Sequence, residues 1–292
     1  MAVRVCVVGS VNADLTYTVV KLPNPGQTVL ASSLTSSPGG KGGNQAVAAA
    51  RAGAAVQLVA ALGTDAAAER LRTHLAANGV GLAGVTNVPG PSGSAAIIVD
   101  SAAQNCIVAA PGANMHLSLS SAAIRSVVAD SDVVLIQLEI PVGTATTAAR
   151  VGRDGGALVI VNASPAARPD HVAVLAELAD VVVVNETEAH DWLTDDSPRA
   201  SQLVITQGAG GASLIADGVQ SRVASPAVEP VDTTGAGDVF AGVLATHWLD
   251  GAEVALRRAC AAGALATLVH GAGDCAPNPE AVDDILETLE TR

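Results

Sequence analysis

The sequence predicts an α/β fold, a three-layer α/β/α sandwich around a mainly parallel sheet, from three observations. Valine-rich segments of strand length alternate along the chain with segments of helical period, which is the pattern of repeated strand–helix units. Hydrophobic residues make up 49% of the chain but aromatic residues only 1%, so the core must consist of alanine-rich helices on valine-rich strands. The 292 residues suffice for one large core, and no linker or internal repeat divides them. We therefore expect one domain over residues 1–292.

The first strand is Val3–Ser10, an apolar run that ends in a Gly-Ser turn. Asn12 and Asp14 follow directly, at the strand end where ligands bind in open parallel sheets, although both residue types are also ordinary in turns. Two segments then break the α/β rhythm, at 15–37 and 94–109. Each contains short alternating strands around turn residues, the first at 15–20 and 28–35. We expect the two segments to pair as a small β lid over a site.

A glycine-rich loop opens the segment Pro38–Gly53, which continues as an alanine-rich helix. No Ser or Thr follows its lysine, so it is not a phosphate-binding P-loop, and it does not match a dinucleotide-binding glycine motif. Its exposed backbone and polar side chains suit a ligand with several hydroxyl groups. The residues that offer these groups are Gly40, Lys41, Gly42, Gly43 and Asn44.

The remaining elements follow the same alternation. Apolar runs predict strands at 56–62, near Val85, and at 133–138, 158–162, 181–184 and 203–206. Helical periods predict helices at 65–78, 118–130, 144–153, 172–178, 252–269 and 279–290. Asn185 with Glu188 three residues later has the pattern of a capping box at a helix start. Residues 212–216 and 219–224 predict a hairpin around Asp217-Gly218.

The segment 231–249, VDTTGAGDVFAGVLATHWL, has the most informative chemistry. Gly235 and Gly237 let a ligand approach the backbone, and the helix that follows offers unpaired N–H groups to a phosphate. Asp238 stands at the same anion site, where a carboxylate can take a proton from a hydroxyl while the amides hold the charge. Asp is also a favoured helix N-cap residue, so this segment alone leaves both roles open.

Composition excludes several classes of partner. The net charge of −13 argues against nucleic acid and against anionic membranes. Lys21 and Lys41 are the only lysines, so an anionic substrate would be held mostly by backbone amides or metal ions. The four cysteines are scattered without zinc-ligand or disulfide-framework spacing. Neither a signal peptide nor an apolar stretch of membrane-spanning length is apparent, which favours a cytoplasmic protein.

Polar residues and glycines recur at predicted strand ends; they are Asn12 and Asp14, Gly39–Asn44, Glu139, Asn185 and Glu188, Thr206–Gly211, and Asp232–Asp238. This sequence resembles the ribokinase-like carbohydrate kinases, the PfkB family. GGKGGNQA at 39–46 and DTTGAGDVFAG at 232–242 carry the resemblance, with support from GSVNAD at 9–14 and NETEA at 185–189. It covers nearly the whole chain and implies the ribokinase-like α/β/α fold with a β lid.

The resemblance implies ATP-dependent phosphorylation of the primary 5-hydroxyl of D-ribose. Asp238 would then be the general base, and Gly235, Ala236 and Gly237 would form the anion hole at the γ-phosphate. The sugar hydroxyls would be held by Asn12, Asp14, Gly40, Lys41, Gly42, Gly43, Asn44, Glu139 and Asp238. ATP would be bound by Asn185, Thr206, Gln207, Gly208, Ala209, Gly210, Gly211 and Gly237, with Cys260 at the adenine.

The resemblance also implies two kinds of metal ion and a second copy of the chain. Mg²⁺ would lie near Glu188, partly through water, and a monovalent cation, usually K⁺, beside the anion hole. Residues that match the K⁺ site are Asp232, Thr234, Ala266, Val269, Gly271 and Cys275. Cys275 stands where the family commonly has a serine, and a thiol is a poor K⁺ ligand, so Asp274, water or backbone would complete the site. The two lids would pair in a homodimer.

Other functions compete with this one. The chain could phosphorylate another small sugar such as fructose, or bind a sugar as a catalytically silent sensor. A nucleoside kinase is disfavoured because few aromatic residues are present to sandwich a base. A dehydrogenase is disfavoured because Gly9–Asn12 lacks the glycine spacing of dinucleotide-binding folds. Lys41 is expected to shape the sugar loop; the histidines His190, His247 and His270 are expected to be structural or at the surface.

Overall fold

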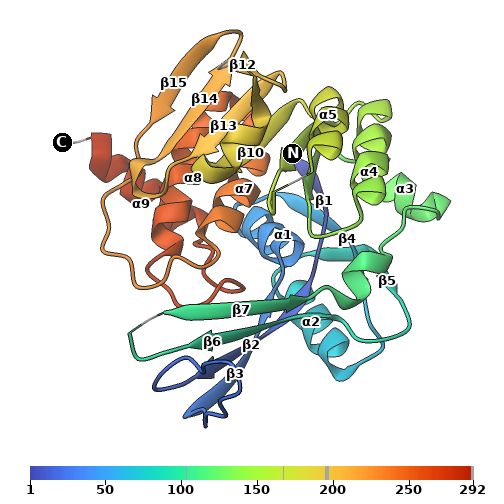
Figure 1. The fold of residues 1–292 in the computed structure, drawn as a ribbon. Coiled ribbons are helices and arrows are strands. Elements are labelled where there is room, and N and C mark those ends of the chain that lie inside the picture. Colours follow the sequence, from blue (N-terminus) through green and yellow to red (C-terminus); the bar gives the residue numbers. More distant parts are fainter. Residues whose placement is uncertain (103, 167, 195–196, 291–292) are drawn as a thin grey trace.

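The computed structural model describes residues 1–102, 104–166, 168–194 and 197–290, and in them nine strands form one large sheet (Figure 1). The strand order is β15-β14-β13-β10-β9-β8-β1-β4-β5. The strands are β1 (Arg4–Val8), β4 (Ala55–Leu62), β5 (Gly81–Asn87), β8 (Val133–Gln137), β9 (Leu158–Asn162), β10 (Val181–Asn185), β13 (Gln202–Thr206), β14 (Ala212–Ala216) and β15 (Val219–Val223). All neighbours from β5 to β13 pair in parallel, and the β14–β15 hairpin continues the sheet antiparallel.

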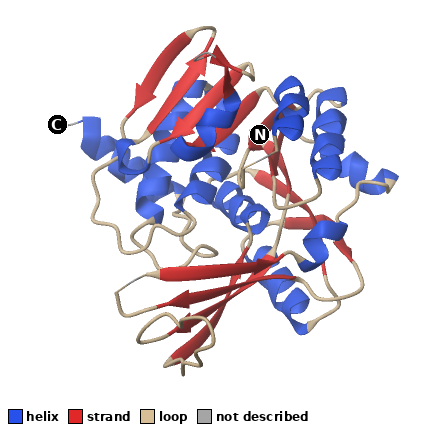
Figure 2. Ribbon diagram, in the orientation of Figure 1, coloured by secondary structure: helices blue, strands red, loops and turns tan. Residues whose placement is uncertain are grey.

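Helices cover both faces of this sheet (Figure 2). They are α1 (Lys41–Arg51), α2 (Ala66–Ala77), α3 (Ala122–Ala129), α4 (Val142–Asp154), α5 (Pro169–Leu178), α6 (Glu186–Ala189), α7 (Ala236–His247), α8 (Ala252–Ala266) and α9 (Pro279–Glu290). Val5 and Val7 of β1 pack into the core formed with α1, α7 and α8, whereas Cys6 and Val8 pack into the core formed with α4 and α5. The predicted three-layer α/β/α fold is confirmed.

A second sheet of four strands lies below the large one in Figure 1, in the order β3-β2-β6-β7. Its strands are β2 (Asn12–Thr18), β3 (Ser33–Gly39), β6 (Gly93–Val99) and β7 (Asn105–Ala110). It arises from the two inserts expected to form strands outside the main sheet. β3 includes Pro38, which an edge strand tolerates because one side of its backbone needs no partner.

Several predicted boundaries are wrong. β2 begins at Asn12, so Asn12 and Asp14 are strand residues rather than turn residues. Residues 28–32 are not a strand, because the register with β2 pairs Ser33 with Thr18 and leaves 19–32 as the connection. Helix α3 starts at 122 rather than 118. None of the helices in the described part of the chain has the length and apolarity to cross a bilayer.

The end of α8 bears directly on the site. The helix stops at Ala266 rather than at 269, because the Thr267 carbonyl accepts hydrogen bonds from the backbone N–H groups of Val231 and Asp232. These contacts hold the start of the 231–249 segment against the end of α8. Residues 269–278 therefore form a loop beside the first turn of α7.

Candidate active site

Helix α7 begins at a glycine that no other residue can replace without strain. Gly235 is the N-cap, with φ 82°, a left-handed conformation that favours glycine. A Cβ there would lie 2.7 Å from the Cα of Ala272 and 3.1 Å from Cys275 Sγ, so the turn also needs the space. A Cβ on Gly237 would meet nothing within 4 Å, which leaves this side of the turn open. The alternative that Asp238 is the helix N-cap is wrong.

Helices α1 and α7 bring the two glycine motifs together. A Cβ on Gly242 of α7 would lie 2.5 Å from the Gln45 carbonyl oxygen and 2.8 Å from Ala48 Cβ of α1. The glycine of the DVFAG segment therefore permits close helix contact rather than ligand approach. As a result the first turns of both helices, and the loops that precede them, face the same space.

Asp238 lies in this contact and is 8% exposed. Its Oδ2 accepts a hydrogen bond of 2.9 Å from Asn44 Nδ2, and its Oδ1 accepts one of 2.9 Å from Gln45 Nε2. Burial raises the pKa of the Asp238 carboxyl, with the nearby charge of Lys41 and the two amide hydrogen bonds acting against that rise. Asn44 was predicted as a sugar ligand; Gln45 was not predicted at all, because its side chain has no chemical signature of its own.

A second acid, Glu139, follows β8. Its Oε2 accepts hydrogen bonds from Ser10 Oγ at 2.5 Å and from the backbone N–H of Lys41 at 3.3 Å. The ends of β1 and β8 and the start of α1 therefore converge on one carboxylate. Ser10 was read only as part of a turn.

The third acid is Asp14, on β2 of the small sheet. Its Oδ1 is buried with no hydrogen-bond partner among the described residues. Burial raises the pKa of Asp14 to about 6, and the charges of Glu139 and Asp238 add to the rise. A buried acceptor without a donor is a place where a ligand hydroxyl would be favourable.

Asn12 is held in place by a residue that the sequence did not single out. Asn114 Nδ2 donates to Asn12 Oδ1 at 2.8 Å, and Asn114 Oδ1 accepts from the Val11 N–H at 3.0 Å. One lone pair of Asn12 Oδ1 is therefore occupied, and the amide N–H groups of Asn12 remain to donate.

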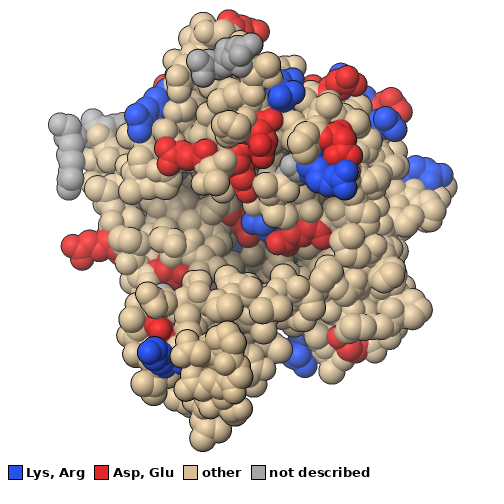
Figure 3. Space-filling view, viewed as in Figure 1, with Lys and Arg blue, Asp and Glu red and all other residues tan. Residues whose placement is uncertain are grey.

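One glycine joins the small sheet to α1. Gly40 lies between the last residue of β3 and the first residue of α1, with φ 84°. A Cβ there would lie 2.6 Å from the Asn12 backbone nitrogen and 2.8 Å from the Val11 Cα. In Figure 3, acidic side chains border a hollow on this face of the molecule, above the four-stranded sheet.

The residues predicted to bind the nucleotide form a second group at the ends of β10 and β13, whose register pairs Asn185 with Thr206. The predicted capping box is present: Asn185 Oδ1 accepts from the Glu188 N–H at 2.9 Å, and Glu188 Oε2 accepts from the Asn185 N–H at 3.0 Å. Gln207 Nε2 donates to Glu186 Oε1 at 3.4 Å, which ties the 207–211 loop to α6. The sequence did not predict this contact.

Cys260 lies beside the same loop. It is buried on α8, and its Sγ is 3.9 Å from the Val223 carbonyl oxygen. A Cβ on Gly211 (φ 91°) would lie 2.0 Å from that oxygen, so Cys260 and the 207–211 loop share one neighbour. Burial raises the pKa of Cys260 to about 12, so the side chain is a thiol at neutral pH. Among the described residues, this second group has no direct hydrogen bond to Asp14, Glu139 or Asp238.

The two segments predicted to hold a monovalent cation meet beside Gly235. Asp232 Oδ1 accepts from the Thr234 N–H and Oδ2 from the Gly271 N–H, both at 2.9 Å. Burial acts to raise the pKa of Asp232, but these hydrogen bonds outweigh it and the pKa is lowered, so the carboxylate is charged. Cys275 Sγ lies 3.3 Å from the Ala272 carbonyl and 3.9 Å from that of Thr234. No cluster of three His, Cys, Asp or Glu side chains in the described ranges could hold a metal, so this site would have to use backbone oxygens.

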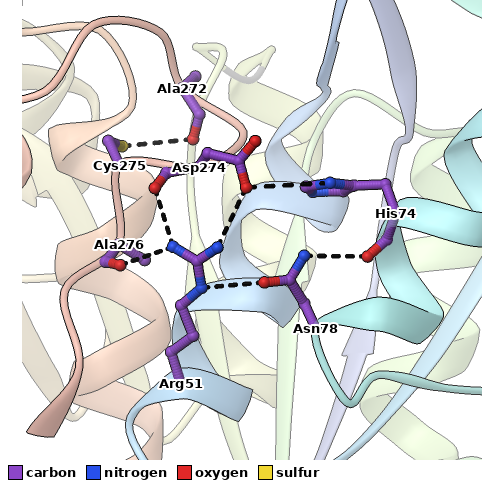
Figure 4. A network of polar contacts seen from close by, with 7 residues as sticks. All are labelled: Arg51, His74, Asn78, Ala272, Asp274, Cys275 and Ala276. Atoms are coloured by element: carbon purple, nitrogen blue, oxygen red, sulfur yellow. Dashed lines mark hydrogen bonds and ion pairs between the residues drawn. The ribbon is translucent and has the colours of Figure 1, made fainter.

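Of the alternatives for completing that site, namely Asp274, water or backbone, the Asp274 side chain is the one that is turned elsewhere. Figure 4 shows its carboxylate turned toward α1, where Oδ1 accepts from Arg51 at 3.0 Å and lies 3.9 Å from His74 Nδ1. Arg51 also donates to the carbonyls of Asp274 and Ala276, both at 2.8 Å, and to Asn78 at 2.9 Å. The guanidinium thus fixes the 272–276 loop, which packs on Gly235, to the end of α1.

Comparisons with known proteins agree with this arrangement. The family model described as pfkB family carbohydrate kinase matches residues 2–279. The ribokinase of Bacillus subtilis is 36% identical over 97% of this chain and 99% of its own, and that of Haemophilus influenzae is 32% identical over 96% and 97%. The solved structure of Arabidopsis thaliana ribokinase complexed with ribose and ATP superposes with a TM-score of 0.88 at 30% identity, over 98% of this chain and 99% of that one. The chain belongs to the pfkB family of carbohydrate kinases, and its fold is ribokinase-like.

Proposed function

We propose that this carbohydrate kinase transfers the γ-phosphate of ATP to the primary 5-hydroxyl of D-ribose, giving ribose 5-phosphate and ADP. The convergence of Asp14, Glu139 and Asp238 beside the open Gly235–Gly237 turn carries the proposal. Charged carboxylates only accept hydrogen bonds, so three of them around one space suit a ligand with several hydroxyl donors. The matching ribokinases support ribose as that ligand.

Asp238 is the base in this proposal. Each of its oxygens accepts one amide hydrogen bond, and lone pairs remain on both for the sugar hydroxyl. The carboxylate takes the proton as the oxygen attacks the phosphorus, and the N–H groups of Gly235, Ala236 and Gly237 stabilise the charge on the transferred group. Those groups stand at the positive end of the α7 dipole.

The remaining residues bind and align the two substrates. The prediction of a loop over 40–44 is wrong, because Gly40 is the N-cap of α1 and residues 41–44 form its first turn. In this proposal sugar hydroxyls are held by Asn12, Asp14, Glu139 and this start of α1, which comprises Gly40, Lys41, Gly42, Gly43 and Asn44. ATP lies along Asn185, Thr206 and the 207–211 loop, with Cys260 at the base. Glu188 is half-buried, and its oxygens have capacity beyond the cap for a water of hydrated Mg²⁺. When bound, that ion supplies positive charge to the phosphate oxygens.

A coupled ATPase assay with and without sugar tests the proposal. Turnover should depend on ribose, with kcat/KM for ribose exceeding the values for 2-deoxyribose, fructose and adenosine. A preference for fructose would overturn ribose as the substrate and retain the kinase. Sugar binding without turnover would instead identify a sensor. We also propose that the protein acts in the cytoplasm, where ATP is available.

We propose that the backbone oxygens near Asp232, Thr234, Ala266, Val269, Gly271 and Cys275 bind K⁺ beside the anion hole. The charged Asp232 and the adjacent carbonyls of Thr234 and Ala272 suit a hard cation, whereas the thiol of Cys275 does not.

Cys275→Ser should lower the KCl concentration for half-maximal activation by about threefold or more, because a hydroxyl is a better K⁺ ligand. Rates are measured against KCl at constant ionic strength. Cys106→Ser, at an exposed thiol, is the matched control, and identical KCl curves for both variants would contradict the site.

We further propose that the small sheet is a lid on a single domain and pairs with a second copy in a homodimer. All six residues of β7 are exposed, including Ile107 at 56% and Val108 at 62%, on a sheet-edge strand. Exposed apolar edges of this kind favour pairing.

The double variant Ile107→Glu, Val108→Glu should convert a dimer of two 28.8 kDa chains into monomers in sedimentation equilibrium. Val254→Glu on α8 is the control, and a dimer that survives the β7 changes would rule out this interface.

A further inference from the structure

A chain of buried amides leads from the middle of the large sheet to Asp238. Gln137, the last residue of β8, donates from Nε2 to Gln45 Oε1 at 2.7 Å. Gln45, on α1, donates from Nε2 to Asp238 Oδ1 at 2.9 Å. Both glutamine side chains belong to residues with no exposed surface. Three side chains from three separate elements therefore form one line of hydrogen bonds that ends on the carboxylate.

The charge of Asp238 determines which atom of each amide in this line donates and which accepts. A charged carboxylate can only accept, so Gln45 must present its NH₂ to Asp238 and its carbonyl to the other side. The neighbour on that side must then donate, and Gln137 does so. An apolar residue in place of Gln137 would leave the Gln45 carbonyl without a donor and remove what keeps its amide from rotating.

Gln137 has little freedom to adopt another orientation. A Cβ on Gly9 would lie 1.5 Å from its Oε1, so Gly9 leaves the space in which that oxygen sits. This oxygen has no donor among the described residues, and the same is true of Gln57 Oε1 on β4, so the unpartnered oxygen alone does not assign a role. What distinguishes Gln137 is its amide hydrogen bond to Gln45, which in turn donates to Asp238.

Asp238 is the group that requires these amide hydrogen bonds. Its burial favours the neutral acid, and a neutral acid cannot accept the proton of a sugar hydroxyl. Asn44 supports Oδ2 from the rim of the site, where the first turn of α1 also faces the sugar. Gln45 supports Oδ1 from the interior, as a residue with no exposed surface.

We propose that Gln137 and Gln45 act as an amide relay that holds the Asp238 carboxylate ionised and oriented toward the reacting hydroxyl. Both are positioning residues, since they touch Asp238 or each other and not the substrate. The inference rests on the proposed role of Asp238 as the base.

The relay is tested first without catalysis. Carboxyl ¹³C NMR of the full chain, with Asp238→Asn to assign the signal, gives the pKa of Asp238 directly. Gln45→Met and Gln137→Met should each raise that pKa by about one unit, because each removes or loosens a donor to the charged form. The control is Gln57→Met on β4, where a buried Oε1 likewise lacks a partner. An Asp238 pKa that is unchanged in both relay variants would overturn the proposal.

Kinetics supply the second readout. At saturating sugar, Gln137→Met should lower kcat about tenfold and move the acid limb of the kcat–pH profile upward, with the sugar KM within about twofold. The titratable groups that face Asp238 from neighbouring elements are Lys41, Asp14, Glu139 and Cys275. All four are unaltered in these variants, so a shifted limb reports on Asp238.

A double variant separates a relay from two independent contacts. Because Gln137 acts only through Gln45, the double variant Gln45→Met, Gln137→Met should have the same kcat as Gln45→Met alone, within about twofold. If the fold-reduction in kcat of the double variant equalled the product of the two single reductions, the relay would be overturned. A chain without sugar-dependent turnover would instead overturn the proposed function, and the NMR titration would still decide the relay.

Discussion

Asp238→Asn is expected to lower kcat by ~10² or more while ribose binds with nearly unchanged affinity, in the range for loss of a general base. Asparagine has the size of the carboxylate but cannot take the proton. The new side chain keeps one oxygen for one of the two amides that now donate to Asp238, and the other amide, of Asn44 or Gln45, has to turn away from the new NH₂ group. Steady-state kinetics give kcat, and calorimetry with ribose gives the affinity.

Asp217→Asn is a matched control for this change. Asp217 lies at the tip of the β14–β15 hairpin with φ 51°, a conformation that asparagine also adopts readily. It should leave both kcat and KM unaltered. If Asp238→Asn turned over within threefold of the unaltered protein, Asp238 would not be the base.

Asp14→Asn is expected to weaken sugar binding and to increase the free energy of unfolding. The pKa of Asp14 is about 6 in the fold, against an ordinary value of 3.8. An acid with a raised folded-state pKa penalises folding when it is charged, so the penalty is absent below pH 4, grows between pH 4 and 6, and is complete above pH 6. Removing the charge should raise the free energy of unfolding by up to about 3 kcal/mol at pH 8, at 1.36 kcal/mol per pKa unit.

The same change should weaken ribose binding by about tenfold or more, since a charged acceptor to a sugar hydroxyl is lost. Urea unfolding at pH 4 and pH 8 measures the stability, and ribose titration at pH 8 measures the binding. Asp154→Asn, at an exposed acid of α4, serves as the control. A stability difference that is equal at both pH values would show that the Asp14 charge is not penalised in the fold.

The sequence was sufficient for the fold and for the principal acids of the candidate site. Strand–helix alternation predicted the layers because buried parallel strands read as continuous apolar runs. The two glycine motifs marked the starts of α1 and α7 because glycine is needed there for backbone conformation or close approach. Glu139 and Asp14 stood out as carboxylates that follow strands. Their roles toward a sugar stay predictions.

The supporting contacts could not be predicted in the same way. Gln45, Gln137, Ser10 and Asn114 are ordinary residue types whose partners lie far away in sequence, so only the packing of α1 on α7 and of β8 on β1 reveals them. The sequence offers Asp274 as one possible ligand of the cation site for the same reason: nothing local indicates that Arg51 approaches it across the fold. The ends of β2 and β3 depend on their mutual register, which alternation alone does not set.

Gly40 gives the small sheet and helix α1 a single-residue joint. Helix α1 is held against α7 at Gly242, so a rotation of the sheet would have to be absorbed at this joint or passed into the first turn of the helix. That first turn carries the Asn44 amide bonded to Asp238. A ligand that moved the small sheet would therefore also move Asn44, so sugar binding and the orientation of Asp238 would be coupled.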